Sequence, residues 1–207
     1  MKYLVLIICT IFLLSSCKKE ELTFIIKGTI SDNTFSGALQ GADVRLYVYP
    51  LGSSLSEYKK NIITDNQGSY KFDLERDKYE KIELIINKDN YFKSNNTITF
   101  SNLTTEEDNV YNYSLTAKSW TKFIFLNQQP SSQDELKIFK DSGKSDCDGC
   151  CPDGYSYYLG AVDTSFYCAN NGNEYMRFYY WVNGNEQNGL DSVYNEPFDT
   201  VVYEYTY

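Results

Sequence analysis

Histidine is absent from the sequence of 207 residues. Histidine is the usual general base of enzymes and a common metal ligand, so its absence removes the serine and cysteine triads that depend on it. The Gly-x-Ser-x-Gly pattern of serine hydrolases is missing as well. The 28 acidic residues are scattered, and nothing in their spacing selects a catalytic pair. We therefore expect a protein that is not an enzyme and has no cofactor, with a carboxylate-dependent hydrolase as the remaining catalytic alternative.

Basic residues are scarce relative to acidic ones. Lys and Arg together number 19, against 28 Asp and Glu, which gives a net charge of -9 at neutral pH. The phosphates of nucleic acids and the surfaces of anionic lipids repel a chain with this balance. We therefore expect no nucleic-acid partner.

Hydrophobic runs are short, and the clearest one lies at the N-terminus. The uncharged apolar run 4–14 follows a single lysine and precedes two serines, which is the layout of a secretory signal. It is too short to span a bilayer as a helix, which takes about 20 residues. The stretch "LSSC", which ends at Cys17, resembles the lipobox of bacterial lipoproteins. The resemblance implies that residues 1–17 form a signal helix with a lipobox and that Cys17 carries palmitate-type acyl chains.

Charged residues follow Cys17 directly, as "KKEE". We expect residues 18–22 to form a tether between the lipid and the first folded domain. The stretch "CKKEE" resembles the export signal of surface lipoproteins of the Bacteroidetes, and it fits an ordinary charged linker equally well. Several acyl chains hold a protein lastingly, because each buried methylene contributes about 0.8 kcal/mol. The expected partner is therefore a membrane of the cell envelope, the outer membrane, with either periplasmic or surface exposure.

Aromatic residues are abundant, with 20 Tyr, 12 Phe and 2 Trp. Together with many Asn, Ser and Thr, they favour strands and turns over helices. The expected fold class is all-β, with an N-terminal signal helix followed by two tandem antiparallel β-sandwich domains. We place the first domain at residues 23–117 and the second at residues 118–207.

The first domain shows the period-two pattern of strands that bury one face. Val44, Leu46 and Val48, for example, alternate with polar or large exposed residues. About seven short strands separated by turn signals, including one at residues 65–68, fit a Greek-key sandwich.

Four stretches of this domain carry a family resemblance: "IKGTISD", "GALQGADVRLY", "TDNQGSYKFDL" and "KIELIINKDNYF". They are similar to the carboxypeptidase-regulatory-like, transthyretin-like β-sandwich family. A departure occurs at Asn90, where the family usually has Gly before Tyr. The resemblance implies a sandwich that serves as a structural, spacing or interaction unit. The matching positions are Thr64, Asp65, Gly68, Tyr70 and Phe72.

The second domain resembles no family that we recognise, and its clearest strand is predicted at residues 174–182. Tyr175, Arg177, Tyr179 and Trp181 share one face of this strand. Exposed Tyr and Trp can stack on sugar rings or anchor a protein interface, so this face is the candidate ligand-binding surface. Buried packing between sheets is the alternative. Because both faces of the strand are bulky, we expect both to be at least partly covered.

Four cysteines remain beyond the tether: Cys147, Cys150, Cys151 and Cys168. Cysteines of envelope proteins usually pair. A bond between the adjacent Cys150 and Cys151 strains the backbone, so we expect one bridge within the loop and one to Cys168. A zinc site is disfavoured because adjacent cysteines cannot both point easily at one ion. A thiol redox site is disfavoured because the surrounding Gly and Pro indicate a loop rather than a helix start.

The cysteine loop also contains Asp146, Asp148 and Asp153, a grouping that raises the possibility of calcium. The twelfth position of an EF-hand loop counted from Asp146 is Tyr157, which is not acidic. We therefore expect solvated aspartates in a turn and no metal.

These observations together predict a membrane-anchored envelope lipoprotein with a non-catalytic binding or structural role. A glycan-binding accessory lipoprotein of a carbohydrate uptake system is the first alternative, and its ligand is a glycan. A protein ligand remains open for the leading prediction. The carboxylate-dependent hydrolase is the second alternative.

Overall fold

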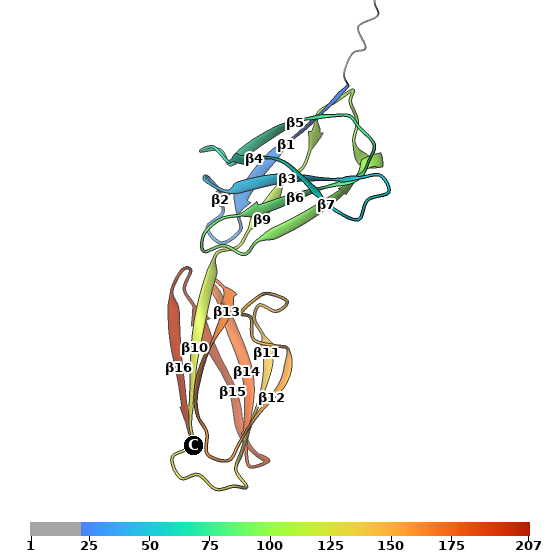
Figure 1. Ribbon diagram of the computed structural model, residues 1–207. Helices are drawn as coiled ribbons and strands as arrows, with labels where there is room; N and C mark the ends of the chain where they lie inside the picture. The colour runs from blue at the N-terminus through green and yellow to red at the C-terminus, as the bar shows by residue number, and fades with distance from the viewer. Residues whose placement is uncertain (1–21) are drawn as a thin grey trace, which may run out of the picture.

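The computed structural model describes residues 22–207, except for the side chains of residues 185–188. The predicted signal segment 1–17 with Cys17, and the tether as far as residue 21, lie outside the described residues. Within residues 22–207 no helix is long and apolar enough to cross a membrane. Nearly all regular structure there is β, and the strands form two sandwiches (Figure 1). The predicted fold class is confirmed for this part of the chain.

The first sandwich contains strands β1 to β9. One of its sheets has the strand order β2-β1-β5, and β8 and β9 also pair with β1. The opposing sheet has the order β4-β3-β6-β7. The bounds are β1 (Thr23–Asp32), β2 (Gly37–Ala38), β3 (Asp43–Pro50), β4 (Glu57–Ile63), β5 (Ser69–Glu75), β6 (Tyr79–Asn87), β7 (Ser94–Thr99), the 3-10 turn Phe100–Asn102, β8 (Asn109–Val110) and β9 (Tyr113–Leu115).

Alternating apolar residues build the core of this sandwich, as the period-two pattern predicts. Ile26, Val44, Leu46, Phe72 and Leu84 come from both sheets and are at most 2% exposed. Burying each such side chain contributes roughly 1.5–3 kcal/mol. Hydrophobic burial between the two sheets is therefore the main source of stability here.

Two features of the first sandwich follow from single residues. Position 28 requires glycine, because a Cβ there would overlap the carbonyl oxygen of Tyr111. The same carbonyl accepts a hydrogen bond of 2.7 Å from the Tyr70 hydroxyl. The predicted turn at residues 65–68 is present, with Gly68 at a φ of 71°. It joins β4 to β5, which lie in opposing sheets, so the turn crosses between the layers.

The second sandwich contains strands β10 to β16. The sheet β13-β10-β16 faces the sheet β12-β11-β14-β15. Phe123, Phe125 and Phe178 are at the centre of the core between them. The bounds are β10 (Lys118–Leu126), β11 (Glu135–Ser142), β12 (Gly154–Leu159), β13 (Asp163–Asn171), β14 (Glu174–Val182), β15 (Asn185–Asn195) and β16 (Thr200–Thr206).

Strand pairing is antiparallel in most of the molecule but not everywhere. β1 runs parallel to β8 and β9, and β10 runs parallel to β16. These parallel pairs are an addition to the predicted antiparallel sandwiches. For β16 the reason is its connection. It follows β15, which lies in the opposing sheet, so the chain crosses between the sheets before β16 begins. Such a crossover allows β16 to run parallel to β10, whereas a tight hairpin joins antiparallel strands.

The two sandwiches follow one another closely and lie end to end (Figure 1). β9 ends at Leu115, and the amide of Lys118, the first residue of β10, donates a hydrogen bond of 2.7 Å to the carbonyl of Asn90. The ring of Phe198 stacks on Phe35 and packs against Tyr91, with centroid distances of 5.8 and 5.4 Å. The start of β1 lies at the end of the first sandwich away from the second.

Candidate ligand-binding face and cysteine loop

The four predicted ligand-binding residues lie on the outer face of β14. Tyr175 is 58% exposed and Tyr179 is 36% exposed, whereas Met176 and Phe178, which point inward, are at most 2% exposed. The outer face of this strand is more open than the inner one, because Tyr175, Arg177 and Tyr179 are exposed there and only partly covered. The sandwich has only two layers, so only the inner face of the sheet has a partner sheet.

Neighbouring strands extend this face with further aromatic side chains. In the sheet register, Phe139 of β11 stands between Tyr155 of β12 and Tyr179 of β14. The ring centroids of Phe139 are 5.0 Å from Tyr155 and 6.4 Å from Tyr179. Trp181 stacks on Tyr179 at 6.1 Å and also lies 6.1 Å from Tyr155. We define the aromatic face as Phe139, Tyr155, Tyr157, Tyr179 and Trp181.

Lys137 places a positive charge within the aromatic face. It pairs with Tyr157 on one side and Trp181 on the other, and its Nζ lies 4.4 Å from the Trp181 ring centroid. The same Nζ lies 5.1 Å from the centroid of Tyr155. A cation over a ring face is attracted by the ring quadrupole, so Lys137 holds the two rings on one patch. Lys137 also covers part of Trp181, which is half-buried.

The structure separates the other two predicted residues from the aromatic face. Arg177 forms an ion pair of 3.1 Å with Asp141, and its Nε donates a hydrogen bond to the hydroxyl of Ser142. Tyr175 packs against Tyr194 of β15, with centroids 5.0 Å apart. Of the predicted residues, only Tyr179 and Trp181 therefore belong to the ring cluster, and Arg177 borders it as a polar neighbour.

The sequence prediction missed Tyr155 and Tyr157, which are both 56% exposed. They lie on β12, a strand that was not predicted. The signal was present, because Tyr155, Tyr157 and Leu159 alternate with inward-facing Ser156 and Tyr158. Tyrosine on both faces of the strand hides this alternation from a simple polar-apolar pattern.

The cysteine loop connects β11 to β12 and contains two disulfides. Cys147 bonds Cys150 within the loop, and Cys151 bonds Cys168 of β13. The prediction of one disulfide within the loop and one to Cys168 is confirmed, and the structure adds which loop cysteine takes part in each, a choice that the sequence left open. A backbone hydrogen bond of 2.7 Å from Ala169 to Gly149 adds a second attachment to β13. All four sulfurs are bonded, so none is free as a zinc ligand.

A buried lysine that sequence reasoning missed holds the same loop from the other side. The side chain of Lys140 is 6% exposed, and its Nζ donates hydrogen bonds to the carbonyls of Cys151 at 2.7 Å and Lys144 at 2.9 Å. Asp153 completes the set with an ion pair of 2.9 Å. The hydrogen bond from Lys140 lowers the pKa of the Asp153 carboxyl from its ordinary value. The ammonium group thus has three partners, as its burial requires.

The three aspartates of the cysteine loop do not gather at one point in the described part of the chain. Among residues 22–207, no group of three or more acidic or cysteine side chains is placed to hold a metal ion. Asp146 and Asp148 are exposed, and Asp153 is paired with Lys140. The loop thus carries two exposed carboxylates and one that is paired with a lysine.

Comparisons with known proteins show likeness at the level of all-β architecture. No protein-family model matches the chain, and no curated protein matches it by sequence. The shaft pilin spaA from Lactobacillus rhamnosus GG aligns over 89% of this chain and 97% of its own, with 10% identity and a TM-score of 0.37. The minor pilin GBS52 of Streptococcus agalactiae aligns over 88% and 94%, with 10% identity and a TM-score of 0.35.

Catechol 1,2-dioxygenase from Acinetobacter sp. ADP1 aligns over 49% of this chain, with 14% identity and a TM-score of 0.35. The alignment spans 55% of the dioxygenase, little more than half its length. These TM-scores and identities are too low to transfer a function. The site must therefore be argued from its own geometry.

Proposed function

We propose that this chain is a non-catalytic envelope lipoprotein that binds a glycan through the aromatic face of its second sandwich. The observation that carries the proposal is the exposed cluster of rings on one open sheet face, with Tyr155 and Tyr157 each 56% exposed. Contiguous exposed apolar patches on a protein surface usually mark a binding site. An accessory lipoprotein of a carbohydrate uptake system is the role that fits this description.

The chemistry of the aromatic face suits a sugar chain. The face of an aromatic ring is negative, so it attracts the weakly positive C–H bonds on the flat side of a sugar ring. Hydroxyl groups at the sugar edge need hydrogen-bond partners. Lys137 within the aromatic face, and the ion pair of Arg177 with Asp141 at its border, supply donors and acceptors next to the rings. A ligand that is apolar on its faces and polar at its edges therefore matches the patch.

The predicted anchor would place this face away from the membrane. β1 starts at the end of the first sandwich opposite the second, so a lipid on Cys17 would put the first sandwich near the bilayer. The amide of Lys118 and the carbonyl of Asn90 join the sandwiches, and β14 runs from this junction toward the far end. Trp181, near the end of β14, is therefore carried outward. The first sandwich then acts as the spacer that its family resemblance implies.

The test uses Trp181 as a reporter. The sequence contains 2 tryptophans, so Trp120→Phe leaves Trp181 as the sole indole fluorophore. The probes are soluble xylan, β-glucan, mannan and starch, titrated one at a time. We expect at least one of them to change the Trp181 emission saturably. Removing the stacked ring with Tyr179→Ala should weaken that binding about tenfold, since truncating an aromatic residue that carries binding energy costs more than about 1 kcal/mol.

Tyr167→Ala is the matched control for this experiment. Tyr167 is also an exposed tyrosine, at 58%, but it lies on β13 of the opposing sheet. Its removal should leave the affinity unchanged. Equal losses in Tyr179→Ala and Tyr167→Ala, or no response to any of the four polysaccharides, would contradict the proposal.

A further inference from the structure

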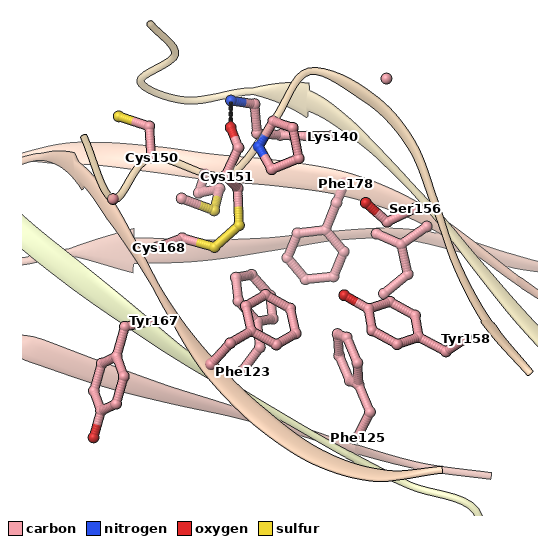
Figure 2. A pocket seen from close by; sticks show the side chains of 16 residues that line it. Phe123, Phe125, Lys140, Cys150, Cys151, Ser156, Tyr158, Tyr167, Cys168 and Phe178 are labelled. Atoms are coloured by element: carbon pink, nitrogen blue, oxygen red, sulfur yellow. Dashed lines mark hydrogen bonds between the residues drawn. A yellow bond between two sulfur atoms is a disulfide. The ribbon is translucent and has the colours of Figure 1, made fainter. Parts of the chain in front are cut away.

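A cavity of about 270 Å³ lies inside the second sandwich, beneath the cysteine loop (Figure 2). It opens between β12 and β13, which are the edge strands of the two opposing sheets. Gly149, Cys150, Cys151 and Pro152 of the cysteine loop form one wall. The cavity is separate from the aromatic face, which lies on the outer side of the same sheet.

The lining is dominated by aromatic rings and sulfur. Phe123 lies 5.4 Å from Phe178 between ring centroids, and Phe125 lies 5.0 Å from Tyr158. The Cys151–Cys168 disulfide and Met176 complete the apolar wall. An apolar cavity of about 150 Å³ already binds benzene. A space of 270 Å³ therefore accommodates more than one ring.

The lining of the cavity has no unpaired charge that an ionic ligand could neutralise. The only charged side chain in the lining is that of Lys140. Its ammonium group is already bound by the carbonyls of Cys151 and Lys144 and by the carboxylate of Asp153. A lysine ammonium has three N–H donors, so none is left for a ligand. The lining therefore offers no free charge to an ionic ligand.

Two hydroxyl groups supply the polar feature of the cavity. The hydroxyl of Tyr158 points into the cavity among the phenylalanine rings, and Ser156 lines the same wall (Figure 2). Burial raises the pKa of Tyr158, which keeps its hydroxyl protonated and able to donate. The Tyr158 hydroxyl therefore offers a hydrogen-bond donor to an oxygen of a molecule in the cavity.

We propose that this cavity binds a small uncharged aromatic molecule that carries one hydroxyl or carbonyl oxygen, held by a hydrogen bond to Tyr158. The rings of the lining provide the apolar contacts, and the cysteine loop, fixed by its disulfide to β13, closes one side. This site is independent of glycan binding on the aromatic face.

The test uses the only methionine among the described residues as a reporter. The sequence has 2 methionines, Met1 and Met176, and Met176 lines the cavity. Labelling the full chain with [13C-methyl]methionine, and assigning Met176 with Met176→Leu, gives one resonance inside the cavity. The probes are 1-naphthol and naphthalene, which differ by one hydroxyl group. We expect both to shift the Met176 resonance saturably, with 1-naphthol binding more tightly.

Two tyrosine variants on the same strand separate the hydrogen bond from general effects. Tyr158→Phe should weaken 1-naphthol about three- to tenfold and leave naphthalene unchanged, the range expected for one hydrogen bond. Tyr157→Phe removes a hydroxyl from the outer face of β12 and should change neither affinity. A Met176 resonance that neither probe moves would overturn the site. Equal effects of Tyr158→Phe on the two probes would overturn the hydrogen bond.

Discussion

At the scale of single residues, Lys140 shows how a buried charge is used to fix a loop. Its side chain is 6% exposed, and it binds two carbonyls and one carboxylate. Each partner on its own gives a modest net stabilisation, but a lysine without them would be strongly unfavourable in this position. The cysteine loop is therefore held at both sides, by Lys140 of β11 and by Cys168 of β13.

The ion pair of Lys140 with Asp153 predicts a pH dependence of stability. The pKa of Asp153 is lowered in the folded protein, so its carboxylate stabilises the fold above the ordinary carboxyl pKa of about 4. This stabilisation is lost as the pH falls through the lowered folded value. We expect the free energy of unfolding of the wild type to fall more between pH 6 and pH 2 than that of Asp153→Asn, as measured by urea denaturation.

Asp148→Asn serves as the control, because Asp148 is exposed in the same loop and forms no ion pair with the described residues. This variant should follow the wild type at both pH values. A gap between wild type and Asp153→Asn that is the same at pH 6 and pH 2 would show that the ion pair does not contribute.

At the scale of strands, the sequence predicts those elements whose inward residues are uniformly apolar. β3 is the clearest case, because Val44, Leu46 and Val48 are all buried. β13 was missed because its inward side mixes Phe166 and Cys168 with Asn170, which is fully buried.

The structure explains why a polar residue is tolerated there. The side-chain amide of Asn170 donates to Asn195 at 2.7 Å, and its oxygen accepts the backbone amide of Lys144 at 2.7 Å. These partners are distant in sequence, so no local pattern reveals them.

The candidate site was predicted only in part for a related reason. The alternation in β14 placed Tyr179 and Trp181 on one face, but the cluster also needs Phe139 and Tyr155 from neighbouring strands. Which strands become neighbours depends on sheet order and register, and neither is encoded in a single strand. Whether the outer face of β14 is exposed also depends on how many sheets or helices pack in layers, and the sequence of one strand does not reveal that number.

The two disulfides predict unequal losses of stability. The bond between Cys151 and Cys168 closes a sequence separation of 17, whereas that between Cys147 and Cys150 closes a separation of 3. A longer closed loop restricts the unfolded chain more. Replacing Cys151 and Cys168 by alanine should lower the free energy of unfolding by about 3 kcal/mol. Replacing Cys147 and Cys150 by alanine should lower it by about 2 kcal/mol. Chemical denaturation under non-reducing conditions measures both, and a reversed order would contradict this explanation.

At the scale of the whole molecule, the two sandwiches lie end to end along one long axis. The chain enters at one end of the first sandwich, and the second sandwich continues from the opposite end (Figure 1). Phe198 packs against both Phe35 and Tyr91, so aromatic contacts support the junction in addition to the backbone. Our proposal assigns the anchor, the spacer and the binding face to successive segments of this axis.

Co-sedimentation of a labelled polysaccharide with isolated envelope membranes tests the joint claim of anchor and binding face most directly. The probe is the polysaccharide that gives the strongest Trp181 response. Envelopes from cells with the wild-type chain should retain it. Trp181→Ala should abolish this retention although the protein stays in the membrane fraction. Cys17→Ala should yield a precursor without acyl chains, which fatty-acid labelling of that variant measures. Equal retention by envelopes carrying the wild type and Trp181→Ala would contradict the account.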